Sequence, residues 1–223
     1  MTLDTTQLIA LAAALGWASG LRLWAVLLFT GAAGALGWVT LPPGLVVLQH
    51  PAVLIATGTM AAIEFLADKI PVLDSVWDAV QTLVRIPGGA LLAAGVFGGD
   101  DTTWVAIAAV LGAALAANSH FAKASLRAAV NTSPEPFSNI SLSMLGDAAV
   151  PVVLWLAVAH PIALLGLVAV AALAMVAITV LLIKFLRALL GRWRGRAGAA
   201  APAPLTPSGR IGPGRGDSAA PRG

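Results

Sequence analysis

The sequence predicts an all-α, polytopic integral membrane protein of about five to six transmembrane helices, some of them broken or re-entrant and amphipathic. Hydrophobic residues make up 59% and charged residues 10% of the 223 residues. The mean hydropathy of +0.91 lies outside the range of soluble globular domains. Long apolar runs alternate with Pro/Gly turns, and the few charges recur at helical spacing between these runs.

The first apolar stretch, residues 8–39, is too long for one straight span of roughly 20 residues. Gly16, Gly20 and Arg22 interrupt it, which predicts either a tilted, broken helix or a helix followed by a short return. Arg22 then either snorkels from a helix end or joins a central polar network. Ala12, Gly16 and Gly20 form a small-residue face that indicates close helix packing within the protein, or a contact between two copies.

A Leu-Pro-Pro-Gly turn at residues 41–44 separates this stretch from a second span at residues 45–66. A short amphipathic helix follows Pro71, and we expect Pro87 and two glycines to break it. Residues 90–97 form the next apolar piece, which is long enough for only half a bilayer. Such half-length pieces beside Pro and Gly are typical of discontinuous membrane helices.

The second half of the chain follows a similar order. Residues 102–117 form a span, residues 118–147 are polar, and residues 148–159 are apolar. A His-Pro break then precedes a last span at residues 162–186.

Residues 1–190 are predicted to form a single transmembrane domain. Two interpretations stay open, an inverted repeat with halves at residues 1–99 and 100–190 or a chain without a repeat. Residues 191–223 change to a basic, Pro/Gly/Ala-rich composition without periodicity, which predicts a disordered tail.

The first polar segment carries a largely acidic stripe. Four residues recur at steps of four, three and four, and therefore share one face of a helix: Asp74, Asp78, Gln81 and Arg85. Three further charges precede them and are expected at the mouth of the same site: Glu64, Asp68 and Lys69.

The second polar segment carries a largely basic stripe. Its residues follow one another at steps of three, four and four: His120, Lys123, Arg127 and Asn131. Asp147 is the carboxylate expected at depth, and Arg85 is its expected partner, because an unpaired charge in a bilayer costs several kcal/mol.

Two arrangements of the stripes are open. They can face each other across a water-accessible cavity near the middle of the membrane, where opposite charges pair and bind a polar substrate. Alternatively, each stripe lies in the headgroup region with its charges in water.

The basic residues of the chain concentrate after the last span. From Lys184 onward there are eight basic residues and one acidic residue, Asp217. The positive-inside rule then predicts a multi-pass protein of the cell inner (plasma) membrane with a cytoplasmic C-terminus. Contact of these Lys and Arg side chains with anionic lipids explains the basic tail, and no nucleic-acid partner is expected.

Recognisable catalytic and cofactor motifs are lacking in the sequence. Cysteine is absent, and His50, His120 and His160 show no metal-ligand spacing. No nucleotide-binding or serine hydrolase motif occurs. We therefore expect no cofactor, no metal and no enzymatic activity.

The run E-F-L-A-D-K-I-P-V-L-D-S-V-W-D at residues 64–78, continued by Q-T-L-V-R at residues 81–85, resembles the signature of a bacterial multi-pass membrane protein family, domain of unknown function 4126. The glycines of the first span, the His120-x-Ala122-Lys123 step and Asn131 are also similar to that family. The resemblance implies a membrane protein without an established activity and supplies no substrate.

We therefore expect a small passive or ion-coupled transporter or channel-like protein with a charged intramembrane cavity, for an anionic or lipid-like substrate. The expected coupling group is a protonatable carboxylate, Asp74, Asp78 or Asp147. The alternative is a non-transporting scaffold or lipid-organising protein whose amphipathic helices lie at the interface. Either kind of protein can form a homo-oligomer.

Overall fold

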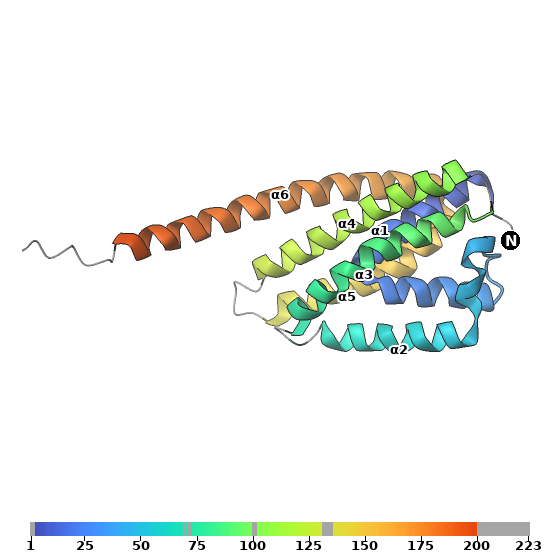
Figure 1. Ribbon diagram of the computed structural model, residues 1–223, viewed down its shortest axis with the longest axis horizontal. Coiled ribbons are helices and arrows are strands. Elements are labelled where there is room, and N and C mark those ends of the chain that lie inside the picture. Colours follow the sequence, from blue (N-terminus) through green and yellow to red (C-terminus); the bar gives the residue numbers. More distant parts are fainter. Residues whose placement is uncertain (1–2, 69, 71–72, 100–101, 131–135, 200–223) are drawn as a thin grey trace, which may run out of the picture. The chain divides into compact units, whose positions relative to one another are not determined.

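A computed structural model describes residues 3–68, 70, 73–99, 102–130 and 136–199, without the side chains of residues 74, 75, 136–140, 142, 186, 189, 190 and 192–199. The described residues form helices joined by short turns and contain no strand (Figure 1), which confirms the all-α class. In chain order the elements are α1 (Thr5–Ala35), the 3-10 helix η1 (Pro43–Gln49), α2 (Pro51–Ala67), α3 (Leu73–Val96), α4 (Thr102–Val130), α5 (Pro136–Ala159) and α6 (Pro161–Ala199).

The helices have the length and composition of a polytopic membrane protein. Among the described residues, four helices are long and apolar enough to cross a membrane, and the pair of η1 and α2 makes a fifth if it counts as one span. That pair is bent by 74°. The predicted second span at residues 45–66 is therefore not straight, because His50 separates its two parts.

The chain divides into two compact units, Met1–Leu186 and Arg187–Gly223. In the second unit, helix α6 continues to Ala199, so the first nine residues of the predicted tail are helical. The rest of that predicted tail, residues 200–223, lies outside the described residues.

Helix α1 consists of two arms that meet at Arg22, whose backbone is not helical (φ −150°, ψ 77°). Asp4 and Gln7 start the first arm with a capping box, each side chain accepting a hydrogen bond from the other's backbone N–H. Leu11 and Ala33 line the same cavity, whereas a straight helix would hold them about 33 Å apart. The second arm therefore returns toward the end at which the first arm began.

Helix α3 runs without interruption through Pro87, so the predicted break there and the separate half-length piece at residues 90–97 are wrong. Proline removes one backbone N–H, and membrane helices tolerate this loss where neighbouring helices enclose the site. The glycines that follow serve close packing instead of a turn. A Cβ on Gly89 would lie 2.6 Å from both the Ala116 Cβ and the Ser19 Oγ.

Glycines bring the backbones of α1, α3 and α4 together. A Cβ on Gly16 would lie 2.8 Å from the Gly112 Cα, and a Cβ on Gly112 would lie 2.6 Å from the Gly89 carbonyl oxygen. Gly20 likewise faces the backbone of α4 at Ala116. The small-residue face predicted in the first stretch therefore packs within the protein.

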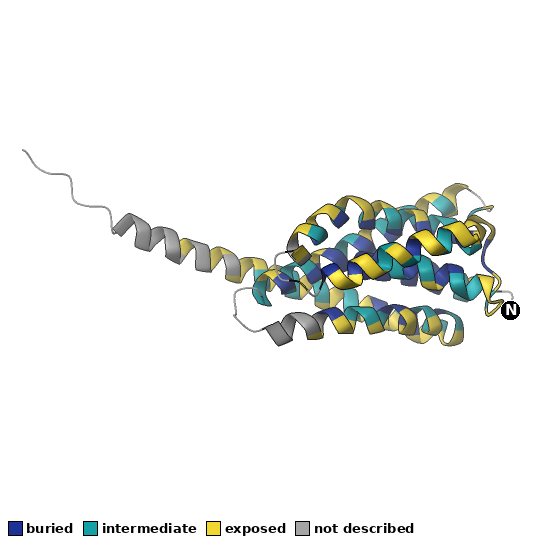
Figure 2. Ribbon diagram, turned by 90° about the horizontal axis from the view of Figure 1, so that it is seen from below, coloured by how far each residue is buried: buried dark blue, intermediate teal, exposed yellow. Residues whose placement is uncertain are grey.

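The outward faces of the helices are apolar, as a bilayer requires. Figure 2 shows exposed residues along the outer sides of the helices, and these include Leu83, Leu91 and Leu173. Helix α6 is the extreme case, because only 6% of its most apolar 18-residue stretch is buried. Its residues Leu164 and Val168 pack against the core. Exposed apolar surface of this extent indicates contact with lipid.

Gly112→Val is expected to destabilise the fold, because a Cβ at this position has no room between Ala93 and the Gly89 carbonyl. The expected loss is about 1–3 kcal/mol in the free energy of unfolding, measured in detergent micelles. Gly166→Val on α6 is the matched control, since a Cβ there meets no atom within 4 Å. Equal losses in the two variants would contradict the close packing of α3 against α4.

Candidate functional site

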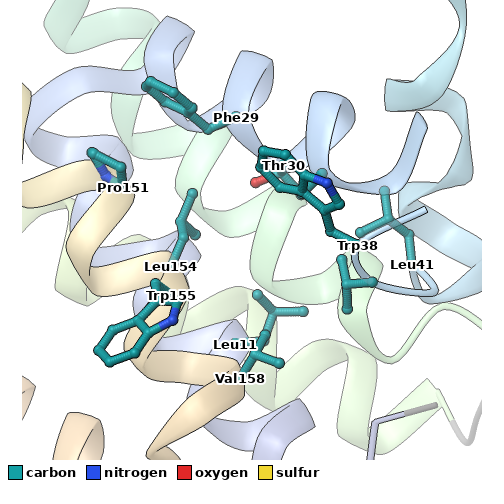
Figure 3. A pocket seen from close by; sticks show the side chains of 11 residues that line it. Leu11, Phe29, Thr30, Trp38, Leu41, Pro151, Leu154, Trp155 and Val158 are labelled. Carbon is teal, nitrogen blue, oxygen red and sulfur yellow. The ribbon is translucent and has the colours of Figure 1, made fainter. Parts of the chain in front are cut away.

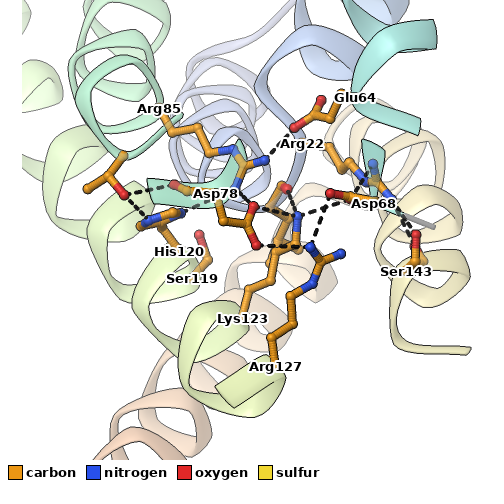
Figure 4. A network of polar contacts seen from close by, with 12 residues as sticks. Arg22, Glu64, Asp68, Asp78, Arg85, Ser119, His120, Lys123, Arg127 and Ser143 are labelled. Carbon is orange, nitrogen blue, oxygen red and sulfur yellow. Dashed lines mark hydrogen bonds and ion pairs between the residues drawn. The ribbon is translucent and has the colours of Figure 1, made fainter. Parts of the chain in front are cut away.

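Eight ionisable side chains from five helices or their ends meet inside the first unit (Figure 4) and form what we call the charged cluster. Seven of them are at most 8% exposed, and the eighth, Asp147, has a side chain that is 28% exposed. The members are Arg22 on α1, Glu64 on α2, Asp68 at its end, Asp78 and Arg85 on α3, Lys123 and Arg127 on α4, and Asp147 on α5.

The cluster lies toward the end of the bundle where α2 and α4 finish and where α3 and α5 begin (Figure 1). On α4, Arg127 is three residues and His120 is ten residues before the last helical residue, Val130. At 1.5 Å per residue, these positions are about 5 and 15 Å from the helix end. The site therefore begins near the end of α4 and extends about 15 Å along the bundle from there.

Arg85 joins α2 to α3. Its Nη1 donates to the Asp78 Oδ1 at 2.7 Å, and its Nη2 donates to the Glu64 Oε1 at 2.5 Å. Asp78 precedes Arg85 by seven residues, which is two helical turns, so both lie on one face of α3. The helical stripe predicted for this segment is the reason why the two side chains meet.

Asp68 and Asp78 share two cations of α4. The Arg127 Nη1 lies 3.1 Å from an oxygen of each carboxylate, and the Lys123 Nζ lies 3.3 Å from the Asp68 Oδ2 and 3.4 Å from the Asp78 Oδ1. Each carboxylate has a third cation as well, Arg22 for Asp68 and Arg85 for Asp78. Shared partners of this kind form a network instead of isolated pairs.

Arg22 enters the cluster because α1 changes direction there. Its Nη1 lies 2.6 Å from the Asp68 Oδ2, and its Nη2 contacts the Asp147 Oδ1 at 2.9 Å and the Ser143 Oγ at 2.8 Å. The bend also leaves the carbonyl of Leu21 to accept a hydrogen bond from the Lys123 Nζ at 3.2 Å. Arg22 therefore joins the central polar network, the second of its two predicted places.

The formal charges of the cluster sum to zero, because four cations face four carboxylates. Even a single charge at the centre of a bilayer costs about 3 kcal/mol or more unless it finds a partner or water. Mutual pairing removes most of that cost. So many charges can therefore be buried together because each one is paired with an opposite charge in the cluster.

His120 borders the cluster in its neutral form. The Arg85 Nη1 lies 3.3 Å from the His120 Nδ1, and arginine can only donate, so Nδ1 accepts. The hydrogen of the ring is then on Nε2, which donates to the Thr82 Oγ1 at 2.7 Å. The Thr82 hydroxyl in turn donates to the Asp78 carbonyl oxygen at 2.9 Å.

Some buried polar atoms of the site have no hydrogen-bond partner within the described protein: the Arg22 Nε, the Arg85 Nε, the Glu64 Oε2 and the Gln81 Oε1. Buried polar groups in proteins are generally paired with protein or water. These atoms are therefore able to form hydrogen bonds with a polar ligand.

Asp68 lies one residue beyond the end of α2 and is surrounded by cations. Burial on its own raises the pKa of its carboxyl, but Lys123, Arg22 and Arg127 outweigh burial. The pKa of Asp68 is consequently lower than its ordinary value, and the carboxylate is held in its charged form.

The structure brings eight of the eleven predicted site residues together, in the cluster or against it: Glu64, Asp68, Asp78, Arg85, His120, Lys123, Arg127 and Asp147. Two others, Lys69 and Asn131, lie outside the described residues, as does the side chain of Asp74.

Two predicted arrangements are wrong. Arg85 pairs with Glu64 and Asp78, and Asp147 pairs with Arg22, so Arg85 is not the partner of Asp147. Glu64 and Asp68 are almost fully buried within the cluster and do not form an exposed mouth. Arg22 had a detectable signal in the sequence, since it is the one charged residue within residues 8–39.

A separate apolar cavity of about 260 Å³ lies between the two arms of α1 and helix α5 (Figure 3). Aromatic side chains line it, among them Phe29, Trp38 and Trp155, together with Leu11 and Leu154. Its lining resembles hydrocarbon in polarity, which suits an apolar chain and not a charged group.

The sequence matches the model of the family described as domain of unknown function (DUF4126), and the match covers residues 9–182. That range includes every member of the charged cluster. Comparison with curated proteins and with solved structures finds no match.

Asp68→Asn is expected to destabilise the protein by about 3–5 kcal/mol, because it leaves three buried cations short of one carboxylate. Asp147→Asn is the matched control and should cost clearly less, since the Asp147 side chain is 28% exposed. Unfolding in detergent or bicelles measures both values. A smaller loss for the Asp68 variant than for the Asp147 variant would contradict the central position of Asp68.

Acidification is expected to weaken the fold through Asp68. Because its folded pKa is below the unfolded value of about 4, its stabilisation is complete above that pH and is lost as pH falls toward the lower folded pKa. The free energy of unfolding should therefore decline below about pH 4, and less steeply in Asp68→Asn. The same pH dependence in variant and natural protein would show that Asp68 is not responsible.

Proposed function

The chain belongs to the family described as domain of unknown function (DUF4126), and we propose that it is a small passive or ion-coupled transporter or channel-like membrane protein. In this proposal the charged cluster is the closed gate of a polar path. The observation that carries the proposal is a set of eight mutually paired charges, seven of them buried, among the helices of a membrane protein.

Such a cluster is a poor device for stability alone. Well-packed apolar side chains of similar volume hold helices together as well as a buried ion pair, or better. Ionisable residues inside membrane proteins generally face water-filled paths or substrates. A function that needs charges to separate and pair again is therefore the better reason for their presence.

The shared contacts are suited to rearrangement. Asp68 and Asp78 each touch three cations, and both touch Lys123 and Arg127. A carboxylate that loses one cation therefore keeps two others. Sequential exchange of partners opens a path without leaving any charge isolated in the membrane.

The arginines favour an anionic group as the transported chemistry. A guanidinium binds carboxylate or phosphate oxygens through two parallel N–H donors. The Nε donors of Arg22 and Arg85 are buried and have no hydrogen-bond partner among the described residues. An anion can therefore compete with Glu64 and Asp78 for Arg85, and the apolar cavity offers room for the apolar part of a lipid-like substrate.

A cytoplasmic C-terminus is part of the proposal, because basic residues follow the last span. The Asn118 Nδ2 donates to the carbonyl oxygen of Ala172, which sets α4 beside α6, and the two helices run in the same direction (Figure 1). Lys184 and Val130 are each twelve residues beyond these contacts, so Lys184 is level with the end of α4. The positive-inside rule favours this end as the cytoplasmic one, where anionic lipids meet the basic residues.

The alternative of a scaffold with helices at the interface has less support. It needs the polar stripe of α3 to face headgroups, whereas Asp78, Gln81 and Arg85 are at most 5% exposed. The opposite face of α3 is the exposed one, for example at Leu83.

Single cysteines test the path, because the natural chain contains none. Gln81→Cys, at a position that is 3% exposed, is expected to react slowly with a membrane-impermeant thiol reagent added to either side of proteoliposomes. Adding Arg85→Gln should accelerate the reaction about tenfold, because it removes the ion pairs with Glu64 and Asp78 and raises the population of the open state.

Leu83→Cys is the matched control. It lies on the same helix two residues further on and is 80% exposed on the lipid side, so a charged reagent should not reach it. Reaction of Gln81→Cys from one side only, or no reaction at all, would refute a path through the cluster.

A further inference from the structure

We propose that His120 is the proton-binding group of the charged cluster, and that its protonation opens the cluster to an anion. The coupled ion is then a proton, and the transported group is an anion that moves together with it. The inference rests on the proposed transport function and names its coupling ion and substrate class.

The contacts of His120 fix where a proton must bind. Its Nε2 already carries a hydrogen and donates to Thr82, while its Nδ1 accepts from the Arg85 Nη1 at 3.3 Å. A proton from water can therefore bind only to the Nδ1 lone pair. That lone pair is the acceptor on which the contact with Arg85 depends.

The sequence suggested Asp74, Asp78 or Asp147 as the proton-binding group. The side chain of Asp74 lies outside the described residues, and the other two carboxylates are less suited to bind a proton. Asp78 faces three cations, and Asp147 faces Arg22 at 2.9 Å. Cations at these distances favour the charged form of a carboxyl. Imidazole is the side chain whose charge changes between about pH 5 and 8 in an unperturbed setting, and His120 contacts the cluster through Arg85.

Protonation turns the contact between His120 and Arg85 from attraction into repulsion. Two N–H donors and two positive charges would then face each other across the same short distance. The imidazolium needs a carboxylate, and Asp78, which holds the Arg85 Nη1 at 2.7 Å, is near. Exchange of Asp78 from Arg85 to His120 releases one edge of the Arg85 guanidinium.

The net charge of the cluster then determines which kind of substrate binds. The eight members of the cluster sum to zero in the closed form, so they offer no net attraction to an anion. One bound proton makes the site positive by one unit and frees the bidentate donor of Arg85 at the same time. A carboxylate, sulfate or phosphate group is the ligand that restores neutrality.

The surroundings of His120 on every helix agree with this sequence of events. Its own helix contributes Lys123, and α3 contributes Arg85 and Asp78, while Glu64 of α2 lies behind Arg85 and Arg22 of α1 lies behind Asp68. The cations among these resist a second positive charge unless the carboxylates re-pair. Proton binding and opening are therefore linked.

The other two histidines lie apart from these contacts. The His50 Nδ1 accepts from the Ala52 N–H at the start of α2, and His160 packs edge-to-face against Trp155 with ring centres 5.6 Å apart.

Nitrogen NMR of the purified protein in lipid nanodiscs tests proton binding without any assay of transport. The His120 ring should show the Nε2–H tautomer at about pH 8 and should gain the doubly protonated form progressively as the pH is lowered. Signals of the Arg85 guanidinium should shift over the same pH range. An Nδ1–H tautomer, a ring that stays neutral, or Arg85 signals that do not follow the ring would each overturn the inference.

Sulfate is the probe for the anion, because its charge is constant over this pH range. At constant ionic strength it should shift the Arg85 signals at the acidic end of the range and not at the alkaline end. The same response at both ends, or none, would overturn the coupling of proton to anion.

Cysteine labelling separates this inference from the proposed function. The labelling rate of Gln81→Cys should rise roughly tenfold from about pH 8 to about pH 5 if the open state rises from about 1% to about 10%. In a His120→Gln background the rise should disappear, whereas His160→Gln should leave it unchanged. Labelling from both sides that ignores pH would retain the path and refute His120 as its switch.

Discussion

The structure depends on one constraint: an ionised side chain that leaves water inside a bilayer must find an opposite charge. Between residues 1 and 183 the chain has five basic side chains, and all but Lys69, which lies outside the described residues, belong to the charged cluster. Each meets a carboxylate on another helix. The positions of these few charges therefore decide which helices come together and at which depth.

Helix α1 shows how this constraint acts on the backbone. Its break at Arg22 turns the second arm back toward the start of the first. At the bend, the Arg22 guanidinium contacts Asp68 at the end of α2, and the Leu21 carbonyl oxygen accepts a hydrogen bond from the Lys123 Nζ. Glycines on α1, α3 and α4 let the backbones approach closely enough for the long side chains to meet. The bend, the close packing and the cluster are one arrangement, because each supplies the geometry that the others need.

Helical spacing made much of the site predictable. The steps of three and four residues correctly place Asp78 and Arg85 on one face of α3, and Lys123 and Arg127 on one face of α4. The partners across helices were not predictable, because spacing within one helix says nothing of the register between two. The predicted break at Pro87 was wrong for a related reason. Proline usually ends a helix in water, but packing against neighbouring helices allows α3 to continue past Pro87.

A double-mutant cycle of Arg22 and Asp68 tests the central claim, that buried charges on separate helices hold the closed cluster together. The free energy of unfolding is measured for the natural protein, for Arg22→Gln, for Asp68→Asn and for the double variant. A contact at 2.6 Å predicts a coupling energy of about 1–3 kcal/mol, with the double variant more stable than the sum of the single losses implies. Additive losses would mean that Arg22 and Asp68 do not interact, and would contradict the account.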